Sequence, residues 1–265
     1  RDPGWKILPP LPPFGHSPLM PVPAAERDAL KKAAAIHAVR MVEPGMILGL
    51  GTGSTAIHAV REIARRHAAG ELPGITTFAT SAEIALAARQ AGLPLLEQAG
   101  PAFLDLTIDG ADEVDPQLNL IKGGGGALFH EKIVAQATKR QIIIVDEAKM
   151  SPQLGTRHSL PVEVVPFGAE SQRVFLAQLG GHPVLRVKED GTAFITDEGN
   201  IIYDCTFGPI ADPGQLAAEL RARTGIVEHG LFLGMTHDLI IGTPNGMRHL
   251  QRNPLTGQIR ELAPS

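Results

Sequence analysis

Residues 46–69 read MILGLGTGSTAIHAVREIARRHAA, and this stretch decides the expected fold. The short apolar run MILGLG has the composition of a buried strand, and AIHAVREIARRHAA has the apolar spacing of a helix. Between them, Gly51-Thr52-Gly53-Ser54-Thr55 is a turn of small residues. A strand, a tight turn and a helix in this order predict one unit of a parallel α/β sheet.

The same alternation continues on both sides of this stretch. Further strands are expected at 75–80, 104–109 and 141–147, and further helices at 24–42, 81–92 and 127–139. Alternation of this kind is typical of a parallel sheet covered by helices. The sequence therefore predicts a Rossmann-like, mostly parallel sheet with helices on both faces.

The regular alternation of strand and helix ends after about Gly155. Over 160–223 the pattern is strand, helix, strand, hairpin and helix, with Asp197-Glu198-Gly199-Asn200 at the hairpin turn. This β-α-β-β-α order predicts a smaller α+β domain. We expect an irregular proline-rich arm at 1–23, a catalytic domain at 24–154, the small domain at 155–230, and a return to the main domain with a C-terminal tail at 231–265.

Composition excludes several classes of protein. The chain has 265 residues, a net charge of −4 and a pI near 6.2, which argues against a general nucleic-acid or membrane-surface binder. Cys205 is the single cysteine, so no intrachain disulfide can form. No run approaches the roughly 18 apolar residues of a membrane span. We expect a cytoplasmic protein without a membrane or nucleic-acid partner.

The turn at 51–55 follows the carboxyl end of a predicted parallel strand, where open α/β sheets bind ligands. Its backbone N–H groups, its hydroxyls and the following helix N-terminus favour an anion such as phosphate. A tight turn with a Ser/Thr cap is the structural alternative. The turn lacks a P-loop lysine and the G-x-G-x-x-G spacing, which argues against a nucleotide or a dinucleotide-dependent dehydrogenase.

A second unusual stretch, DGADEVDPQLNLIKGGGGALFHEK, covers residues 109–132. Asp109 and Asp112 follow a strand, and such a pair can cap a turn, bind a metal or hydrogen-bond a polyol. Lys122 precedes four glycines, whose N–H groups can form an anion-binding nest. Glu131 lies on the next helix. It is either a carboxylate that transfers a proton or an ordinary solvent-facing acid of that helix. Lys149 follows another strand end.

The neighbours of these residues are expected to be ordinary. We interpret Glu113 and Asp115 as solvated loop acids, and His130 and Lys132 as exposed side chains. A metal is disfavoured at the aspartates because Lys122 would compete electrostatically. A phosphate-binding turn, hydroxyl-binding aspartates, a carboxylate base and a cation together suit sugar phosphate chemistry, in which a proton is abstracted beside a carbonyl.

The ordered set of motifs resembles ribose-5-phosphate isomerases of the A type. The matching segments are GLGTGSTA at 49–56, DGADEV at 109–114, LIKGGGGAL at 120–128, EKI at 131–133 and IVDEAK at 144–149. The resemblance implies interconversion of ribose 5-phosphate and ribulose 5-phosphate through an enediolate, without a metal or organic cofactor. It also implies a homodimer or homotetramer.

The resemblance also implies roles for individual residues. Glu131 would move the proton between C1 and C2, Asp109 and Asp112 would assist at the hydroxyls, and Lys122 would stabilise the intermediate. The remaining substrate contacts that it implies are Thr52, Gly53, Ser54, Thr55, Gly110, Ala111, Gly123, Gly124, Gly125 and Lys149.

Two alternatives stay open on this kind of fold. One is a coenzyme A transferase-like enzyme, in which Glu131 would be a nucleophile rather than a base. The other is a sugar-phosphate-binding module without catalysis. The Asp109–Asp112 pair favours a polyol phosphate over an acyl-CoA, and the chain has no helix-turn-helix or basic segment that would couple sensing to DNA.

Overall fold

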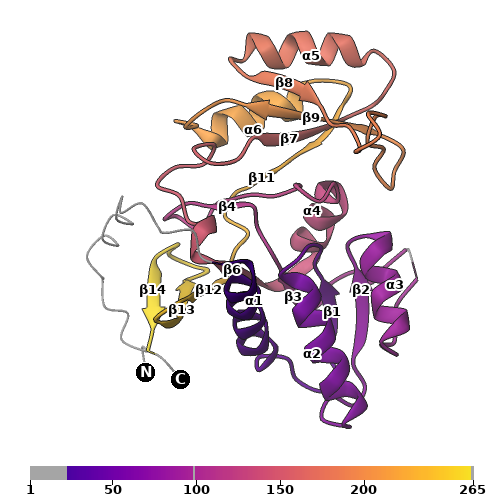
Figure 1. Ribbon diagram of the computed structural model, residues 1–265, viewed down its shortest axis with the longest axis vertical. Helices are drawn as coiled ribbons and strands as arrows, with labels where there is room; N and C mark the ends of the chain where they lie inside the picture. The colour runs from indigo at the N-terminus through magenta and orange to yellow at the C-terminus, as the bar shows by residue number, and fades with distance from the viewer. Residues whose placement is uncertain (1–22, 98, 264–265) are drawn as a thin grey trace. The chain divides into compact units, whose positions relative to one another are not determined.

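A computed structural model describes residues 23–97 and 99–263 (Figure 1). The expected N-terminal arm therefore lies, apart from Pro23, outside the described residues. By its internal contacts the chain divides into two compact units. The described part of the first unit holds 23–97, 99–110, 134–150 and 235–263, and the second unit holds 111–133 and 151–234.

The first unit is built on a seven-stranded sheet with the order β14-β13-β12-β6-β3-β1-β2. Its strands are β1 (Ile47–Leu50), β2 (Thr76–Ala79), β3 (Leu104–Asp109), β6 (Thr138–Asp146), β12 (Asp238–Thr243), β13 (Gly246–Arg252) and β14 (Ile259–Leu262). The five strands from β2 to β12 pair in parallel, whereas β13 and β14 add an antiparallel edge. The predicted mostly parallel α/β sheet is confirmed.

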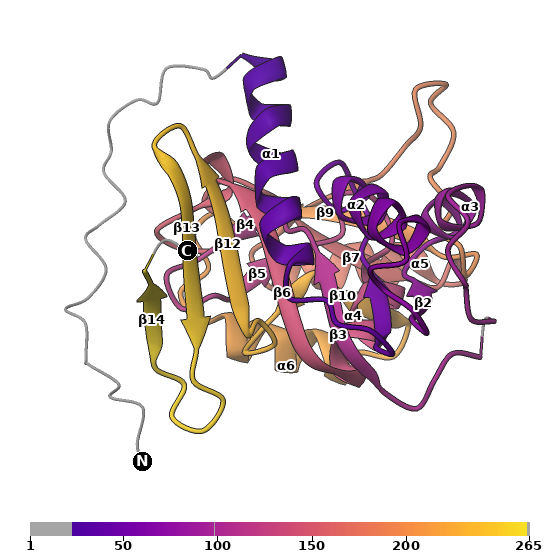
Figure 2. The ribbon, with the colours of Figure 1, turned by 90° about the horizontal axis from the view of Figure 1, so that it is seen from below.

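Three helices of the first unit match the expected positions. They are α1 (Ala24–Val39), α2 (Ala56–Ala68) and α3 (Ala82–Gln90). Figures 1 and 2 show α1 and α2 side by side along the sheet; α1 also packs against β6 and β12, and α3 packs against β2. Ser81 caps α3 by accepting a hydrogen bond from the Ile84 N–H at 3.3 Å, as serine commonly does at a helix N-terminus.

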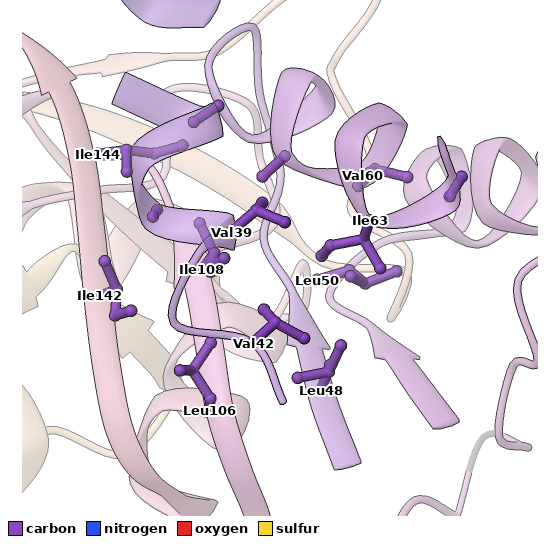
Figure 3. Packing of buried hydrophobic residues seen from close by; sticks show 14 of the residues in the cluster. Val39, Val42, Leu48, Leu50, Val60, Ile63, Leu106, Ile108, Ile142 and Ile144 are labelled. Carbon is purple, nitrogen blue, oxygen red and sulfur yellow. The ribbon is translucent and has the colours of Figure 1, made fainter. Parts of the chain in front are cut away.

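The core of this unit lies between the sheet and these helices (Figure 3). Alternate strand residues point to the same face of a sheet, so β1 and β3 present side chains to the helices at every second position. Their partners come from α1 and α2. The labelled core residues are Val39, Val42, Leu48, Leu50, Val60, Ile63, Leu106, Ile108, Ile142 and Ile144. Burial of each larger side chain contributes about 1.5–3 kcal/mol, which holds the carboxyl ends of the strands in place.

The second unit contains a four-stranded antiparallel sheet with the order β10-β7-β9-β8. Its strands are β7 (Leu160–Val164), β8 (His182–Leu185), β9 (Ile201–Thr206) and β10 (Ile226–His229), and its helices are α5 (Ala169–Gln178) and α6 (Pro213–Ala222). Leu160, Val162 and Val164 lie in one core with Leu176 of α5 and Leu220 of α6. The alternation along β7 therefore buries one face of the sheet under both helices.

The expected hairpin at 193–205 is only partly present. Its turn is where the sequence indicated: the Gly199 N–H donates to the Thr196 carbonyl, and the Thr196 N–H donates to the Asn200 carbonyl, each at 2.9 Å. The first arm is not a strand, because only the single bridge Ile195–Ile201 joins it to β9. β9 pairs instead with β7 and β8.

A small three-stranded sheet in the second unit was not predicted. Its strands are β4 (Glu113–Val114), β5 (Leu120–Ile121) and β11 (Leu231–Phe232), in the order β11-β5-β4. Two-residue strands are too short to show a period, and β11 lies far along the chain from β5. This pairing groups residues 111–133 with the second unit, whereas the sequence-based division assigned them to the first domain.

Two short helical elements lie at or next to boundaries between the units. α4 (Leu128–Ala137) begins in the second unit and ends in the first, and η1 (Glu147–Lys149) is a single 3-10 turn that follows β6. No helix in the described part of the chain is long and apolar enough to cross a membrane.

Candidate active site

The turn at 51–55 joins β1 to α2 in the first unit. The Gly51 N–H donates to the Ile108 carbonyl of the neighbouring strand β3 at 3.0 Å. The Thr52 hydroxyl lies 2.8 Å from the Thr80 hydroxyl and 2.9 Å from that of Ser81, so the end of β2 holds the turn from its other side. The turn therefore presents the N-terminus of α2 at the carboxyl edge of the sheet, where its N–H groups and helix dipole favour an anion.

A lysine that the sequence analysis missed lies at this turn. Lys31 of α1 donates from Nζ to the Ser54 hydroxyl at 2.9 Å. Its neighbour Lys32 is exposed and makes no such bond among the described contacts. In the sequence the two lysines look alike, because only the packing of α1 against α2 decides which one reaches the turn.

Asp109 ends β3 and is completely buried. Its Oδ1 accepts a hydrogen bond from the Gly110 N–H at 2.7 Å. The backbone of Gly51 passes directly against this side chain: a Cβ at Gly51 would lie 2.1 Å from Asp109 Oδ1 and 2.5 Å from Asp109 Cα. Position 51 must therefore be glycine for Asp109 to keep its place.

Lys149 ends η1, directly after β6, and is half-buried. Asp146 begins this turn by accepting a hydrogen bond from the Ala148 N–H at 3.0 Å. Because β6 pairs in parallel with β3, Lys149 follows the strand beside the one that ends in Asp109. The predicted residues of the first unit therefore all follow carboxyl ends of parallel strands.

The second unit holds the other set of predicted residues, and its centre is an ion pair. Lys122 Nζ lies 3.2 Å from Glu131 Oε1, and the two side chains are 2% and 5% exposed. Lys122 directly follows β5, where its N–H donates to the Gly230 carbonyl at 2.9 Å. Glu131 lies in the first turn of α4. The fold therefore brings two residues nine positions apart in the sequence into direct contact.

Residues 123–126 form a β-turn between the two members of this pair. The Gly126 N–H donates to the Gly123 carbonyl at 2.9 Å, and both residues have positive φ, +84° and +104°. These conformations favour glycine. At the exposed tip, the Gly124 N–H donates to Asp112 Oδ2 at 2.7 Å. The turn therefore brings Asp112, Lys122 and Glu131 into one cluster of the second unit.

The expectation that Lys132 is exposed was wrong. Its side chain is 1% exposed, and Nζ donates to Glu228 Oε1 at 2.6 Å and to the His229 carbonyl. Nζ also lies 4.8 Å from the centre of the Phe232 ring. Burial lowers the pKa of Lys132 to about 8, although the Glu228 carboxylate opposes this shift. His130, by contrast, is partly exposed and lies 2.7 Å from Glu198.

Glu113 and Asp115 are also buried rather than solvated. Glu113 accepts hydrogen bonds from the backbone N–H groups of Gly155, Arg157 and His158 at 2.9, 3.1 and 3.2 Å. Asp115 accepts from the N–H groups of residues 117 and 119 at 2.9 and 2.8 Å. Both buried carboxylates thus find backbone partners in nearby loops, as buried polar groups usually do, so we interpret their role as structural.

The predicted residues thus fall into two sets. The first unit carries Thr52, Gly53, Ser54, Thr55, Asp109, Gly110 and Lys149, and the second carries Ala111, Asp112, Lys122, Gly123, Gly124, Gly125 and Glu131. The chain passes from one set to the other at the peptide bond between Gly110 and Ala111. Within residues 23–97 and 99–263, no group of three or more His, Cys, Asp or Glu side chains is arranged to hold a metal ion.

Comparison with known proteins identifies the family. Residues 76–246 match the family model described as ribose 5-phosphate isomerase A (phosphoriboisomerase A). The chain belongs to the ribose 5-phosphate isomerase A family. The ribose-5-phosphate isomerase A of Chloroflexus aurantiacus is 53% identical over 223 residues, which cover 84% of this chain and 93% of that protein.

Solved structures of this family have the same fold. A D-ribose-5-phosphate isomerase in complex with phospho-erythronic acid has a TM-score of 0.83 at 35% identity, covering 85% of this chain and 99% of its own. The ribose 5-phosphate isomerase A of Methanocaldococcus jannaschii has a TM-score of 0.81 at 36% identity, covering 85% of this chain and 100% of its own. The resemblance noted from the motifs is therefore confirmed at the level of family and fold.

Proposed function

We propose that this protein interconverts D-ribose 5-phosphate and D-ribulose 5-phosphate, with Glu131 as the base. The observation that carries the proposal is the buried Glu131 carboxylate beside the buried Lys122 ammonium, at a glycine turn, in a chain of the ribose 5-phosphate isomerase A family. Isomerisation needs a carboxylate that moves a proton and a cation that stabilises the negative charge formed on oxygen. This pair supplies both groups.

The proton transfer runs between C1 and C2 of the open-chain sugar. Glu131 removes the proton from C2, the electron pair forms a C1–C2 double bond, and the charge moves to O1 as an enediolate. Lys122 and the Gly125 N–H of the turn at 123–126 stabilise that oxyanion. Transfer of the O2 proton to O1, together with return of the proton from Glu131 to C1, gives the ketose. Asp109 and Asp112 act at the sugar hydroxyls during ring opening and proton transfer at oxygen.

The phosphate group is assigned to the turn at 51–55. The first-turn N–H groups of α2, the hydroxyls of Ser54 and Thr55, and the Lys31 ammonium are donors suited to a dianion. Lys31 joins the proposal because it already contacts Ser54. Lys149 and the backbone at Gly110 and Ala111 complete the proposed substrate contacts.

The family match favours the isomerase over the two alternatives, a coenzyme A transferase-like enzyme and a binding module without catalysis. In the complex solved for a relative, the ligand is phospho-erythronic acid. Its planar carboxylate has the shape and charge of an enediolate end. We therefore expect phospho-erythronic acid to inhibit this protein competitively.

The deciding experiment is conversion of ribose 5-phosphate to ribulose 5-phosphate in deuterated water, with EDTA present. Conversion with solvent deuterium at C1 or C2 supports proton transfer through a protein base, and conversion without label indicates that the base returns the same proton. No conversion by well-folded protein rejects the isomerase and directs the search to acyl-CoA transfer and sugar phosphate binding. Activity that EDTA abolishes and a metal restores would assign Asp109 and Asp112 to a metal site.

Two further parts of the proposal concern the whole protein. We propose a homodimer or homotetramer located in the cytoplasm. Light scattering coupled to gel filtration measures the first, and a mass of about 28 kDa would contradict it, because the single chain weighs 28.1 kDa. Fractionation of the producing cells measures the second.

A further inference from the structure

An arginine in the second unit holds the glycine turn from behind. Arg186 directly follows β8, and its Nη1 donates to the carbonyls of Gly123 and Gly124 at 2.8 and 3.2 Å. Its Nε donates to Asp204 Oδ2 at 2.9 Å, and its Nη2 donates to Oδ1 of the same carboxylate. One edge of the guanidinium is therefore fixed on β9, and the rest is directed at two consecutive carbonyls of the turn.

The Phe194 ring packs against the same guanidinium. The centre of its ring lies 5.8 Å from Arg186 Cζ, and the Phe194 N–H donates to the Arg186 carbonyl at 2.9 Å. The ring also closes the space beside Gly126, where a Cβ would lie 2.4 Å from Phe194 Cζ. Arg186 and the end of the turn are thus packed against one aromatic ring.

These contacts determine which way the peptide groups of the turn point. A trans peptide directs its C=O and its N–H to opposite sides. In the peptide between Gly123 and Gly124, the C=O accepts from Arg186 and the N–H donates to Asp112. In the next peptide, the C=O of Gly124 again faces Arg186. The N–H of Gly125 therefore points away from Arg186, at the exposed tip, and within the described part of the chain no protein group accepts from it.

We propose that Arg186 is a positioning residue for the isomerisation: by holding the carbonyls of Gly123 and Gly124, it directs the N–H of Gly125 at the enediolate oxygen. This inference rests on the proposed function. Four glycines in sequence have little conformational preference of their own, so an external group must fix the turn before it can act as a preorganised oxyanion site. Arginine suits the task because its planar fork donates to two carbonyls and a carboxylate at once, which a lysine cannot do.

The test compares Arg186→Met and Arg186→Lys with Arg223→Met in steady-state isomerisation. Arg223 is a matched control: it lies in the same unit, its Cζ is 4.9 Å from the centre of the Phe175 ring, and it donates to Gln172 and Ser171, away from the turn. We expect Arg186→Met to lower kcat by about 10–100-fold with KM within about 3-fold, because a loose turn loses stabilisation of the transition state more than binding of the phosphate. Arg186→Lys should be intermediate.

Two readouts separate positioning from a general loss of structure. The affinity for phospho-erythronic acid, whose carboxylate stands in for the enediolate, should fall in Arg186→Met by about the same factor as kcat, whereas that for inorganic phosphate stays within about 3-fold. Millimolar ethylguanidinium should restore part of kcat in Arg186→Ala and none in Arg223→Ala. If Arg186→Met does not fold, the kinetics of Arg186→Lys and the rescue of Arg186→Ala test the positioning role instead.

The outcomes also separate this inference from the proposed function. An inactive, folded wild type rejects the isomerase itself. An active wild type with Arg186 variants that keep full kcat, or that lose phosphate and phospho-erythronic acid affinity equally without rescue, rejects the positioning role and leaves the isomerase intact.

Discussion

The Lys122 ammonium and the Glu131 carboxylate lie 3.2 Å apart in a buried environment, nine residues apart along the chain. Removing one member of such a pair leaves an uncompensated buried charge, which costs about 3–5 kcal/mol. Loss of activity after Lys122→Ala would therefore combine chemistry with stability. A substitution that keeps the hydrogen bond but removes the basicity tests the chemistry more cleanly.

Glu131→Gln is that substitution. Its amide oxygen can still accept from Lys122, but it cannot take a proton from carbon, so we expect kcat to fall by about 10²–10⁴-fold with little change in substrate affinity. Steady-state kinetics and calorimetric binding of ribose 5-phosphate measure the two quantities. Glu189→Gln, at an exposed position, is the control. A kcat near that of the wild type would remove Glu131 as the base.

The site residues that could be predicted from the sequence lie in local motifs, and those that were missed make contacts between residues far apart in the sequence. Short motifs that follow predicted strands were enough to predict the turn at 51–55, Asp109 and the two residues Lys122 and Glu131. Lys31 reaches Ser54 from 23 residues away, and Arg186 reaches Gly123 from 63 residues away. Such contacts exist only after the elements have packed, and no local pattern distinguishes Lys31 from Lys32.

The sequence analysis also failed to predict which charged residues are buried. Glu113 and Lys132 read as ordinary polar positions, since most such side chains are exposed. Glu113 can be buried because three backbone N–H groups around Gly155 donate to its carboxylate. Lys132 can be buried because Glu228 and the His229 carbonyl accept hydrogen bonds from its ammonium. Both sets of partners come from distant segments. The parallel strands β1, β2, β3 and β6, by contrast, were predicted because each is a short apolar run next to a helix with its own apolar spacing, whereas the antiparallel edge of β13 and β14 was not predicted.

Gly51→Ala should displace the Asp109 carboxylate without replacing any ionisable residue. The added Cβ would lie 2.1 Å from Asp109 Oδ1, far inside contact distance, so the carboxylate or the strand end must move. Displacement of about 1 Å in a reacting group can cost on the order of 10²-fold in rate. Gly45→Ala is the control for backbone strain without a clash, because Gly45 has φ +78°, which disfavours alanine, but its Cβ would meet no atom within 4 Å. Equal kcat values for the two variants would show that Asp109 tolerates displacement.

Lys31→Met should weaken phosphate recognition. Lys31 is the cation that contacts Ser54 in the proposed phosphate turn, and hydrogen bonds to a charged group contribute about 1.5–3 kcal/mol. We expect KM for ribose 5-phosphate and the inhibition constant of inorganic phosphate to rise together by about tenfold or more, with a smaller effect on kcat. Lys32→Met removes an adjacent, exposed charge and should change neither. Equal effects of both variants would indicate long-range attraction only.

Stability of the first unit should fall in acid through Asp238, at the start of β12. This carboxylate accepts from Arg140 Nε at 2.7 Å and from His249 Nε2 at 2.8 Å. Burial alone would raise the pKa of Asp238, but the hydrogen bonds from His249 and Arg140 outweigh it and lower the pKa from 3.8 to about 2. The unfolded chain therefore binds the proton more readily than the folded one as the pH drops.

The contribution of Asp238 is complete above about pH 4 and is lost as the pH falls from there through about 2, with a size of about 2 kcal/mol. Urea unfolding at a series of pH values measures it. Asp238→Asn should be less stable than the wild type at pH 7, because Arg140 loses its ionic partner, and its free energy of unfolding should decline less steeply below pH 4. If the variant declines as steeply as the wild type, the acid sensitivity comes from other carboxylates, and the Arg140–Asp238 pair contributes little to stability.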